Sequence, residues 1–187
     1  MPDHSTNGVF GHAALQTGRY RVELTTANAS HLPPLENAHE RAAIGQELTA
    51  ALHDLVALSL TGKQLHWMVT GPSAHSLHLQ LDEVVDVCRT LSDTVAERAV
   101  TLGHDFDGQA GAVAAGTEVP VVPTGSVADH IVVHEITHRV AIVAERVRAR
   151  LERVGAVDLV SQDVLIEVTR ELEKQQWLLR MQAGARS

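Results

Sequence analysis

Four long stretches with apolar residues at helical spacing, separated by breaks containing Gly and Pro, constrain the fold of this chain more than any other feature. Apolar residues recurring every three or four positions mark one face of an α-helix. The pattern predicts helices over about residues 36–66, 74–102, 127–154 and 158–182. We therefore expect an all-α fold, a four-helix bundle with a long connection between its second and third helices. The apolar positions are Ile44, Leu48, Leu52 and Leu55 in the first helix, Val84, Cys88, Leu91, Val95 and Leu102 in the second, and Leu165, Val168, Leu172 and Trp177 in the fourth.

The breaks give the expected helix ends. Residues 70–73, with the sequence Thr-Gly-Pro-Ser, end the first helix, and Ser73 is predicted to cap the second. Gly103 is expected to end the second helix. Residues 104–125 are rich in Gly, Pro and Ala and form the long connection, with a short helix predicted near Ala110–Ala115.

The two ends of the chain differ from this pattern. Residues 1–36 lack helical periodicity and are predicted to form a flexible tail with a short extended piece at Tyr20–Leu24. The bundle is expected over residues 37–183, followed by a short tail at 184–187. No basic region followed by an apolar region opens the sequence, so we do not expect secretion by a standard signal. No apolar run approaches bilayer length. We therefore expect a soluble, cytoplasmic protein without a membrane partner; association with the nucleoid stays open.

Composition narrows the class of protein. The formal net charge is −8 at pH 7, and Lys63 and Lys174 are the only lysines. This balance argues against broad electrostatic binding of nucleic acid, which needs clustered basic residues. The arginines between positions 146 and 153 are interpreted as a solvated helix end, where cations complement the helix dipole. The single cysteine, Cys88, excludes an intrachain disulfide.

Two pairs of metal-capable side chains lie on the second predicted helix, His78 with Asp82 and Asp93 with Glu97. Each pair has i,i+4 spacing, so its members lie one turn apart on the same face. The eleven residues from Asp82 to Asp93 span about 16 Å of helix. A ligand atom lies within about 2–2.6 Å of its ion, so the two pairs cannot share a metal within one chain.

The two pairs are symmetric about a point beside Val87 and Cys88. A two-fold axis at that point would lay an antiparallel partner helix alongside, with each pair facing the other pair of the second subunit. On a helical wheel the four side chains lie more than about 120° from the core stripe, so they point out of their own bundle. A solvated face is the alternative, because Asp86 and Arg89 share it. The residue types, the symmetry and His66 at the end of the preceding helix favour a metal site.

These residues resemble the ferroxidase signature of the Dps proteins, the mini-ferritins of bacteria. The likeness covers roughly residues 40–183, through the stretches LHW…GPSAHSLHLQLDE…DTVAERAVTLG and DLVSQDVLIEVTRELEKQQW. The matching residues are His66, Trp67, His78, Asp82, Asp93, Glu97 and Arg98.

The resemblance implies a ferritin-like bundle assembled as a homododecamer, a hollow shell with ferroxidase sites at its two-fold dimer interfaces. Such sites bind non-haem iron and oxidise Fe(II) to Fe(III), preferably with hydrogen peroxide, and the shell stores the mineral and protects against oxidative stress. Hard carboxylate oxygens favour the higher charge of Fe(III). Trp67 is interpreted as a packing wall, with a radical sink as the alternative. The implied catalytic and iron-binding residues are His66, His78, Asp82, Asp93 and Glu97.

The chain departs from the family pattern for DNA binding. DNA-binding members commonly use tails rich in Lys and Arg, whereas this N-terminal tail contains only Arg19 and Arg21, and the C-terminus adds Arg186. DNA binding is therefore not supported by a basic tail, and protonation of the tail histidines at mildly acidic pH is a hypothesis for restoring some attraction. The main alternative function is a DNA-coating, nucleoid-compacting protein with minor iron chemistry.

A competing motif lies in the third predicted helix. Residues His134–His138 read H-E-x-x-H, in which two histidines bind zinc and the glutamate acts as general base of a peptidase. The extended form of that motif needs Gly and His where this chain has Ala141 and Ala144. Glu167 or Glu171 could supply a third ligand, but nothing in the sequence marks either. A peptidase is thus the third interpretation.

The same helix carries a histidine stripe, His130, His134 and His138, at i,i+4 spacing. We interpret the stripe as a solvated or interfacial polar face. An iron-entry funnel is the alternative, because shells of the resembled family admit iron through polar pores.

Overall fold

The computed structural model describes residues 33, 35 and 37–184. The tail predicted for residues 1–36, with its extended piece at Tyr20–Leu24, lies outside this part apart from residues 33 and 35, as does the end of the C-terminal tail, residues 185–187.

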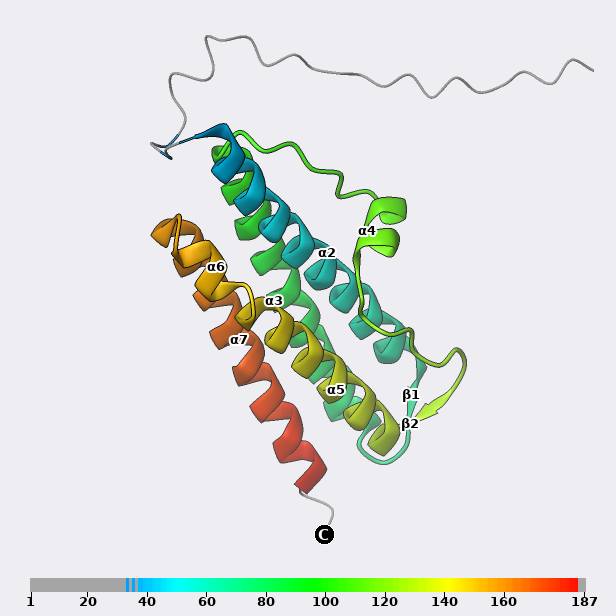
Figure 1. Ribbon diagram of the computed structural model, residues 1–187. Helices are drawn as coiled ribbons and strands as arrows, with labels where there is room; N and C mark the ends of the chain where they lie inside the picture. Colours follow the sequence, from blue (N-terminus) through cyan, green and yellow to red (C-terminus); the bar gives the residue numbers. More distant parts are fainter. Residues whose placement is uncertain (1–32, 34, 36, 185–187) are drawn as a thin grey trace, which may run out of the picture. The chain divides into compact units, whose positions relative to one another are not determined.

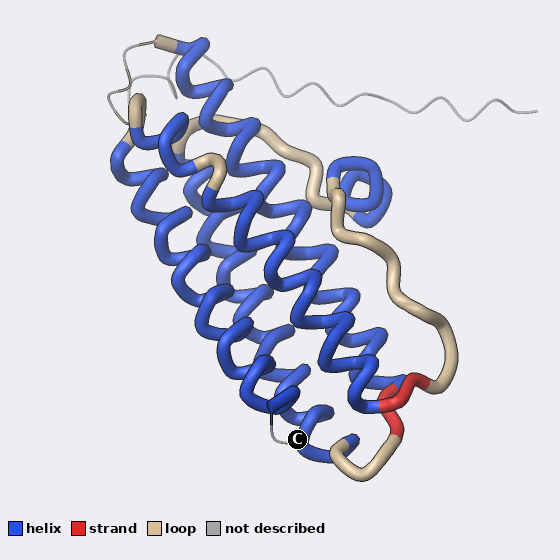
Figure 2. The backbone as a smooth tube through the Cα atoms, turned by 60° about the horizontal axis from the view of Figure 1, so that its bottom comes forward, coloured by secondary structure: helices blue, strands red, loops and turns tan. Residues whose placement is uncertain are grey.

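Four long helices form the bundle, and their axes run side by side in both backbone views (Figures 1 and 2). They are α2 (Ala38–Met68), α3 (Ala74–Thr101), α5 (Asp129–Arg148) and α7 (Leu159–Gly184). Helix α2 packs along α3, and α5 packs along α7; further contacts between α2 and α5 and between α3 and α7 close the bundle. The all-α, four-helix prediction is confirmed, and none of these helices is both long and apolar enough to cross a membrane.

The apolar stripes meet between the helices. Every stripe position predicted for the first two helices is buried. In α7, Leu165, Val168 and Leu172 are buried, whereas Trp177 lies on the surface with 52% of its area exposed. Burial raises the pKa of the Cys88 thiol to about 12, so this side chain is a neutral part of the core.

Close packing of α2 on α3 depends on Gly62. A β-carbon at Gly62 would lie 2.8 Å from a methyl group of Val85 on α3, closer than two carbons can pack. Gly62 is about one turn before His66, so this close approach brings the end of α2 near the start of α3.

The turn between α2 and α3 corrects one predicted helix cap. Ser73 occupies the N-cap position of α3, but its side chain makes no capping hydrogen bond. Its backbone N–H instead donates to Asp129 Oδ2 at 2.8 Å, across from the start of α5. Gly71 has a φ of 119°, and a β-carbon there would meet the same carboxylate at 2.9 Å. The turn therefore needs glycine. The Asp129 carboxylate holds the turn through the backbone of Ser73, whereas the expected side-chain cap does not form.

The helix predicted over residues 127–154 is divided. Its first two residues form β2 (Val127–Ala128), which pairs in parallel with β1 (Val69–Thr70). After α5, a separate short helix, α6 (Leu151–Gly155), leads to α7. The break coincides with Arg150, a buried side chain that reaches Glu47 of α2 at 3.3 Å. Both departures therefore occur at residues with partners far away in the chain, which local periodicity does not report.

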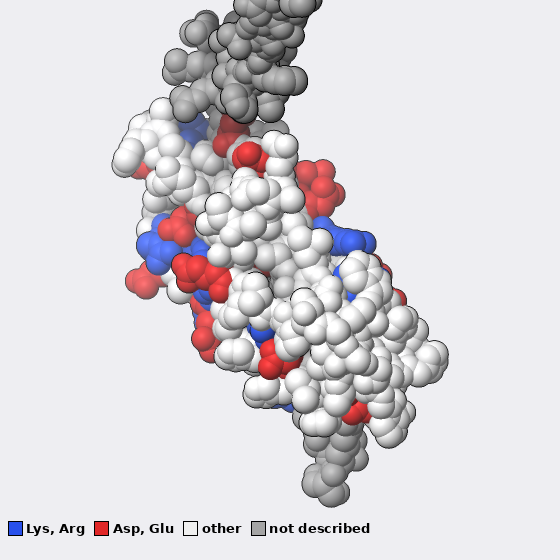
Figure 3. All heavy atoms as spheres, turned by 90° about the vertical axis from the view of Figure 1, so that its right-hand side faces the viewer, with Lys and Arg blue, Asp and Glu red and all other residues white. Residues whose placement is uncertain are grey.

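The long connection matches its prediction. Gly103 has a φ of 72° just beyond α3, as a glycine that ends a helix commonly does. The connection then forms α4 (Ala110–Gly116), which packs against α2 (Figure 1). Figure 3 shows that the face on this side of the molecule carries few charged side chains.

Candidate metal centre

Two helices bring a pair of imidazoles together. His66 lies in the last turn of α2 and is 8% exposed, and His78 lies in the second turn of α3. Their rings stack with centroids 3.5 Å apart and planes inclined by 25°. Each Nδ1 lies 3.1 Å from the backbone carbonyl oxygen of the other residue. When Nδ1–H donates to these carbonyls, Nε2 of each ring keeps the lone pair that a metal ion requires.

Asp82 completes the cluster one turn after His78. One of its carboxylate oxygens lies 3.2 Å from His66 Nδ1, and its side chain is 39% exposed. A ligand atom from each of His66, His78 and Asp82 can be chosen so that all three lie within 4.8 Å of one another. Two imidazoles and a carboxylate suit iron, zinc and similar divalent ions.

Lys63 is a neighbour of this cluster that sequence reasoning did not identify. Its ammonium group donates a hydrogen bond to Asp82 Oδ1. That hydrogen bond lowers the pKa of Asp82 below its ordinary value of 3.8; desolvation opposes the shift, while charge on His66, Lys63 and His78 adds to it. Asp82 is thus an anionic ligand at neutral pH, and an arriving cation competes with Lys63. The sequence contained a sign of this contact, because Lys63 precedes His66 by three residues and therefore lies on the same face of the helix.

Asp93 and Glu97 do not join the other three predicted ligands within this chain. Both are exposed on α3, further along the helix than Asp82, and the cluster of convergent ligand atoms contains neither. This separation agrees with the expected helical rise of about 16 Å between the two pairs.

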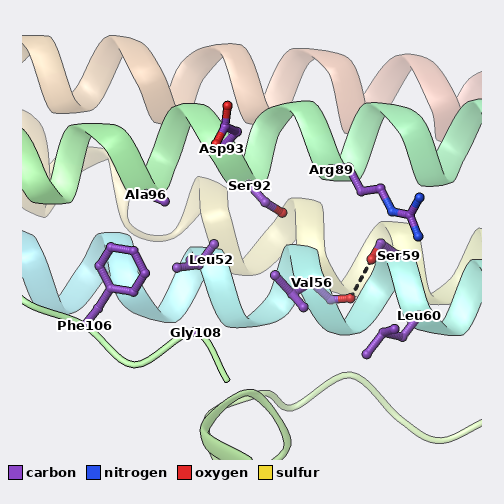
Figure 4. A pocket seen from close by; sticks show the side chains of 10 residues that line it. All are labelled: Leu52, Val56, Ser59, Leu60, Arg89, Ser92, Asp93, Ala96, Phe106 and Gly108. Carbon is purple, nitrogen blue, oxygen red and sulfur yellow. Dashed lines mark hydrogen bonds between the residues drawn. The ribbon is translucent and has the colours of Figure 1, made fainter. Parts of the chain in front are cut away.

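A surface groove of about 470 Å³ runs between α2 and α3 beside Asp93 (Figure 4). Leu52, Val56 and Leu60 line it from α2, and Phe106 and Gly108 of the long connection contribute to its wall. Asp93 and Arg89 contribute polar groups from α3, and in Figure 4 the Asp93 carboxylate points away from α2. The acidic pair is thus accessible from outside the bundle.

Arg98 fixes the α3 end that carries the acidic pair. Its Nη2 donates to Asp158 Oδ2 at 2.6 Å, and its Nε donates to Ser161 Oγ at 2.9 Å. Burial of Asp158 raises its pKa, but hydrogen bonds from Ser161 and Arg98 and the Arg98 charge outweigh burial and lower the pKa below 3.8. The contact joins α3 to the start of α7 next to Glu97.

The arginines near the end of α5 are engaged by carboxylates, so their interpretation as a solvated helix end was only partly right. Arg150 is 6% exposed, and Asp54, which accepts a 2.8 Å hydrogen bond from Arg146, is fully buried. The ion pairs are Arg146–Asp54, Arg146–Glu118, Arg148–Glu173, Arg150–Glu47, Arg150–Asp54 and Arg153–Glu47.

The H-E-x-x-H residues lack the arrangement of a peptidase site. Glu135 forms a 2.7 Å ion pair with Arg139, which is buried and also donates to the carbonyl oxygens of Pro120 and Val121. The glutamate that would act as general base is therefore committed to a structural contact. Within the part of the chain that the structure describes, no third ligand joins the motif's histidines.

Comparisons with known proteins agree with this fold. A family model described as a ferritin-like domain matches residues 45–185. The chain is 36% identical over 155 residues to the fine tangled pili major subunit of Haemophilus ducreyi, covering 82% of this chain and 81% of that protein. It is 37% identical over 125 residues to the DNA protection during starvation protein of Mycolicibacterium smegmatis, covering 66% of this chain and 67% of the relative.

Solved structures extend the likeness to three dimensions. The tetragonal form of Mycobacterium smegmatis Dps superposes with a TM-score of 0.77 at 31% identity, covering 81% of this chain and 92% of that one. The chain therefore belongs to the Dps family of ferritin-like proteins.

Proposed function

We propose that this protein is a ferroxidase and an iron-storing mini-ferritin. Fe(II) is its substrate, hydrogen peroxide is the preferred oxidant, and Fe(III) mineral is stored inside a shell of twelve subunits. The observation that carries the proposal is the convergence of two imidazoles and an ionised carboxylate, from His66, His78 and Asp82, at the junction of α2 and α3.

The second half of each iron site comes from a neighbouring subunit. Asp93 and Glu97 are exposed, anionic and too far along α3 to reach the cluster of their own chain. The two pairs are symmetric about Val87 and Cys88, so an antiparallel α3 of a second copy would set its acidic pair against this cluster. One two-fold contact would then create two identical sites.

The residues contribute charge and geometry to the oxidation. Carboxylates stabilise Fe(III) more strongly than Fe(II) because hard anionic oxygens favour the higher charge. Two Fe(II) ions held close together give one electron each to hydrogen peroxide; its O–O bond breaks, and with two protons the oxygens leave as two water molecules. Because both electrons arrive together, no hydroxyl radical is released.

A DNA-coating function remains the alternative, and the charge distribution of the bundle does not favour it. Lys63 pairs with Asp82, Lys174 pairs with Glu171 at 3.2 Å, and the arginine cluster near the end of α5 is engaged by carboxylates. Phosphate binding requires cations that are free to contact the nucleic acid backbone. Gel-shift assays between pH 5.5 and 8 test whether the tail histidines supply them.

Complementation between two inactive variants tests both the activity and the sharing of the site. One variant carries His66→Ala with His78→Ala, and the other carries Asp93→Ala with Glu97→Ala. Each alone should lose peroxide-dependent Fe(II) oxidation. In co-assembled particles every mixed dimer regains one of its two sites, so about a quarter of the wild-type rate should return.

The control is Glu145→Ala with Glu152→Ala, which removes two negative charges at exposed positions of α5 and α6 and should oxidise iron normally. Particle mass in solution is measured for every sample. Restored activity in mixed particles supports a shared site. Activity that never returns, in particles of normal mass, would place the complete site within one chain or remove the ferroxidase proposal.

A further inference from the structure

The histidines of the H-E-x-x-H motif are left without a role once its glutamate is engaged. Glu135 is held by Arg139, whose guanidinium is anchored on the carbonyl oxygens of Pro120 and Val121. The imidazoles of His134 and His138, in contrast, project from the exposed face of α5.

The two rings are already arranged as neighbours. Their centroids are 6.4 Å apart, and their planes are inclined by only 7°. Two imidazole nitrogens bound to one tetrahedral zinc ion lie about 3.3 Å apart, given Zn–N bonds of about 2.0–2.1 Å. Histidines at i and i+4 on one helix face can meet this spacing, as the zinc-peptidase motif illustrates. Because both rings are exposed, small side-chain rotations can bring a nitrogen of each onto one ion.

We propose that His134 and His138 form a surface site that binds a borderline divalent cation of the zinc, copper or nickel class. The donor set consists of neutral nitrogens, because Glu135 is committed to Arg139. Imidazole suits these cations, whereas magnesium and manganese prefer oxygen ligands, and Fe(II) stands below nickel, copper and zinc in affinity for such a site. The site is therefore chemically distinct from the cluster that contains Asp82, and it is independent of the ferroxidase proposal.

His130 continues the stripe by one turn but differs in its surroundings. It lies in the first turn of α5, where the positive end of the helix dipole disfavours a bound cation. Its Nδ1 atom lies 3.7 Å from Asp129 Oδ1, and its side chain is 67% exposed. We therefore exclude His130 from the site, which makes it a control of the same residue type on the same helix.

Calorimetric titration of the full-length protein with Zn²⁺ tests the proposal, since zinc binds without redox chemistry. Wild type is compared with the single variants His130→Ala, His134→Ala, His138→Ala and Glu135→Gln. We expect His134→Ala and His138→Ala each to lose the same single equivalent of zinc per chain. His130→Ala and Glu135→Gln should retain it. The other histidines, including those of the N-terminal tail and the α2–α3 cluster, are present in every sample, so differences between variants isolate this site.

Circular dichroism of each variant checks that the total helix content matches wild type. A His138→Ala protein that titrates like wild type would overturn the proposal, as would loss of the equivalent in His130→Ala. Loss in Glu135→Gln would instead show that the Glu135 carboxylate is a zinc ligand, which would also contradict the proposal. Cu²⁺ electron paramagnetic resonance gives a second readout: nitrogen coupling assigned to this site should disappear from His134→Ala and His138→Ala alone.

Discussion

The two polar pairs on α3 have the same spacing in the sequence but very different surroundings in the fold. His78 and Asp82 lie against the end of α2, which adds the buried imidazole of His66 and the ammonium of Lys63. Asp93 and Glu97 lie on the exposed face, and within residues 37–184 no ligand-type side chain joins them in a metal cluster. We call these the histidine half and the acidic half.

The difference indicates how assembly and metal binding are linked. The histidine half is organised before any second subunit arrives, because hydrogen bonds and ring stacking fix its side chains. The acidic half offers two solvated carboxylates, which in the proposed shared site bind metal only when a second subunit faces them. Side chains that are already fixed lose less conformational entropy when they bind a cation. We therefore expect the histidine half to contribute most of the Fe(II) affinity.

The largest expected effect separates the two halves by affinity. Under anaerobic conditions, His66→Ala with His78→Ala should weaken Fe(II) binding by more than about 100-fold, because two ligands of the preformed half are lost. Asp93→Ala with Glu97→Ala should weaken the first Fe(II) bound by only about 10-fold. Equilibrium titration measures both values, and equal losses in the two variants would contradict the asymmetry of the halves.

The next largest effect is expected for the Arg98–Asp158 ion pair, which holds the end of α3 that carries the acidic half. Asp158→Asn removes the charged partner of Arg98, and breaking this largely buried ion pair should lower the free energy of unfolding by about 2–4 kcal/mol at pH 7. Because the folded pKa of Asp158 lies below 3.8, its stabilisation is complete above that value and is lost as the pH falls through the folded pKa.

Urea unfolding of wild type and Asp158→Asn measures this effect at pH 7 and again at acidic pH. The difference between the two proteins should narrow below about pH 4. Asp163→Asn, at an exposed position of α7 five residues after Asp158, should behave like wild type. A difference that stays constant with pH would show that the Asp158 charge is not responsible.

A smaller effect is expected for the close packing of α2 on α3 at Gly62, which positions the histidine half. Gly62→Ala would place a β-carbon 2.8 Å from a Val85 methyl group, so α2 and α3 must separate slightly. Overpacking of this kind costs about 1–3 kcal/mol. Thermal unfolding and Fe(II) titration should show lower stability together with weaker binding. Gly111→Ala, where a β-carbon meets nothing within 4 Å, is the control that should keep wild-type Fe(II) affinity without a loss of stability.

The smallest expected effect concerns Lys63. Lys63→Met removes the ammonium group that competes for Asp82, so Fe(II) should bind about 2- to 5-fold more tightly, in keeping with a partly exposed ion pair. Lys174→Met changes the only other lysine and should leave Fe(II) affinity unchanged. Weaker binding in Lys63→Met would mean that Lys63 orients Asp82 for the metal and does not compete with it.

Sequence reasoning reached much of the fold because the relevant information is local. Helical periodicity follows from 3.6 residues per turn, and Gly103 ends α3 where its positive φ is needed. The failures share one cause. Ser73 bonds Asp129 through its backbone and does not cap α3, residues 127–128 pair with β1 and do not join the predicted helix, and Arg150 turns inward toward Glu47. Each depends on a partner more than fifty residues away in the chain.

The candidate site divides along the same line. The sequence by itself identified the side chains that we propose as iron ligands. It also determined that the two pairs on α3 lie too far apart to share an ion, and that their spacing is symmetric. Only the tertiary structure decided that His66 stacks on His78 and that Lys63 donates a hydrogen bond to Asp82. It also decided that Glu135 forms an ion pair with Arg139 and is not free to act as a general base. Spacing along one helix is fixed by its rise and turn, whereas contacts between helices depend on how residues such as Gly62 and Val85 pack against one another.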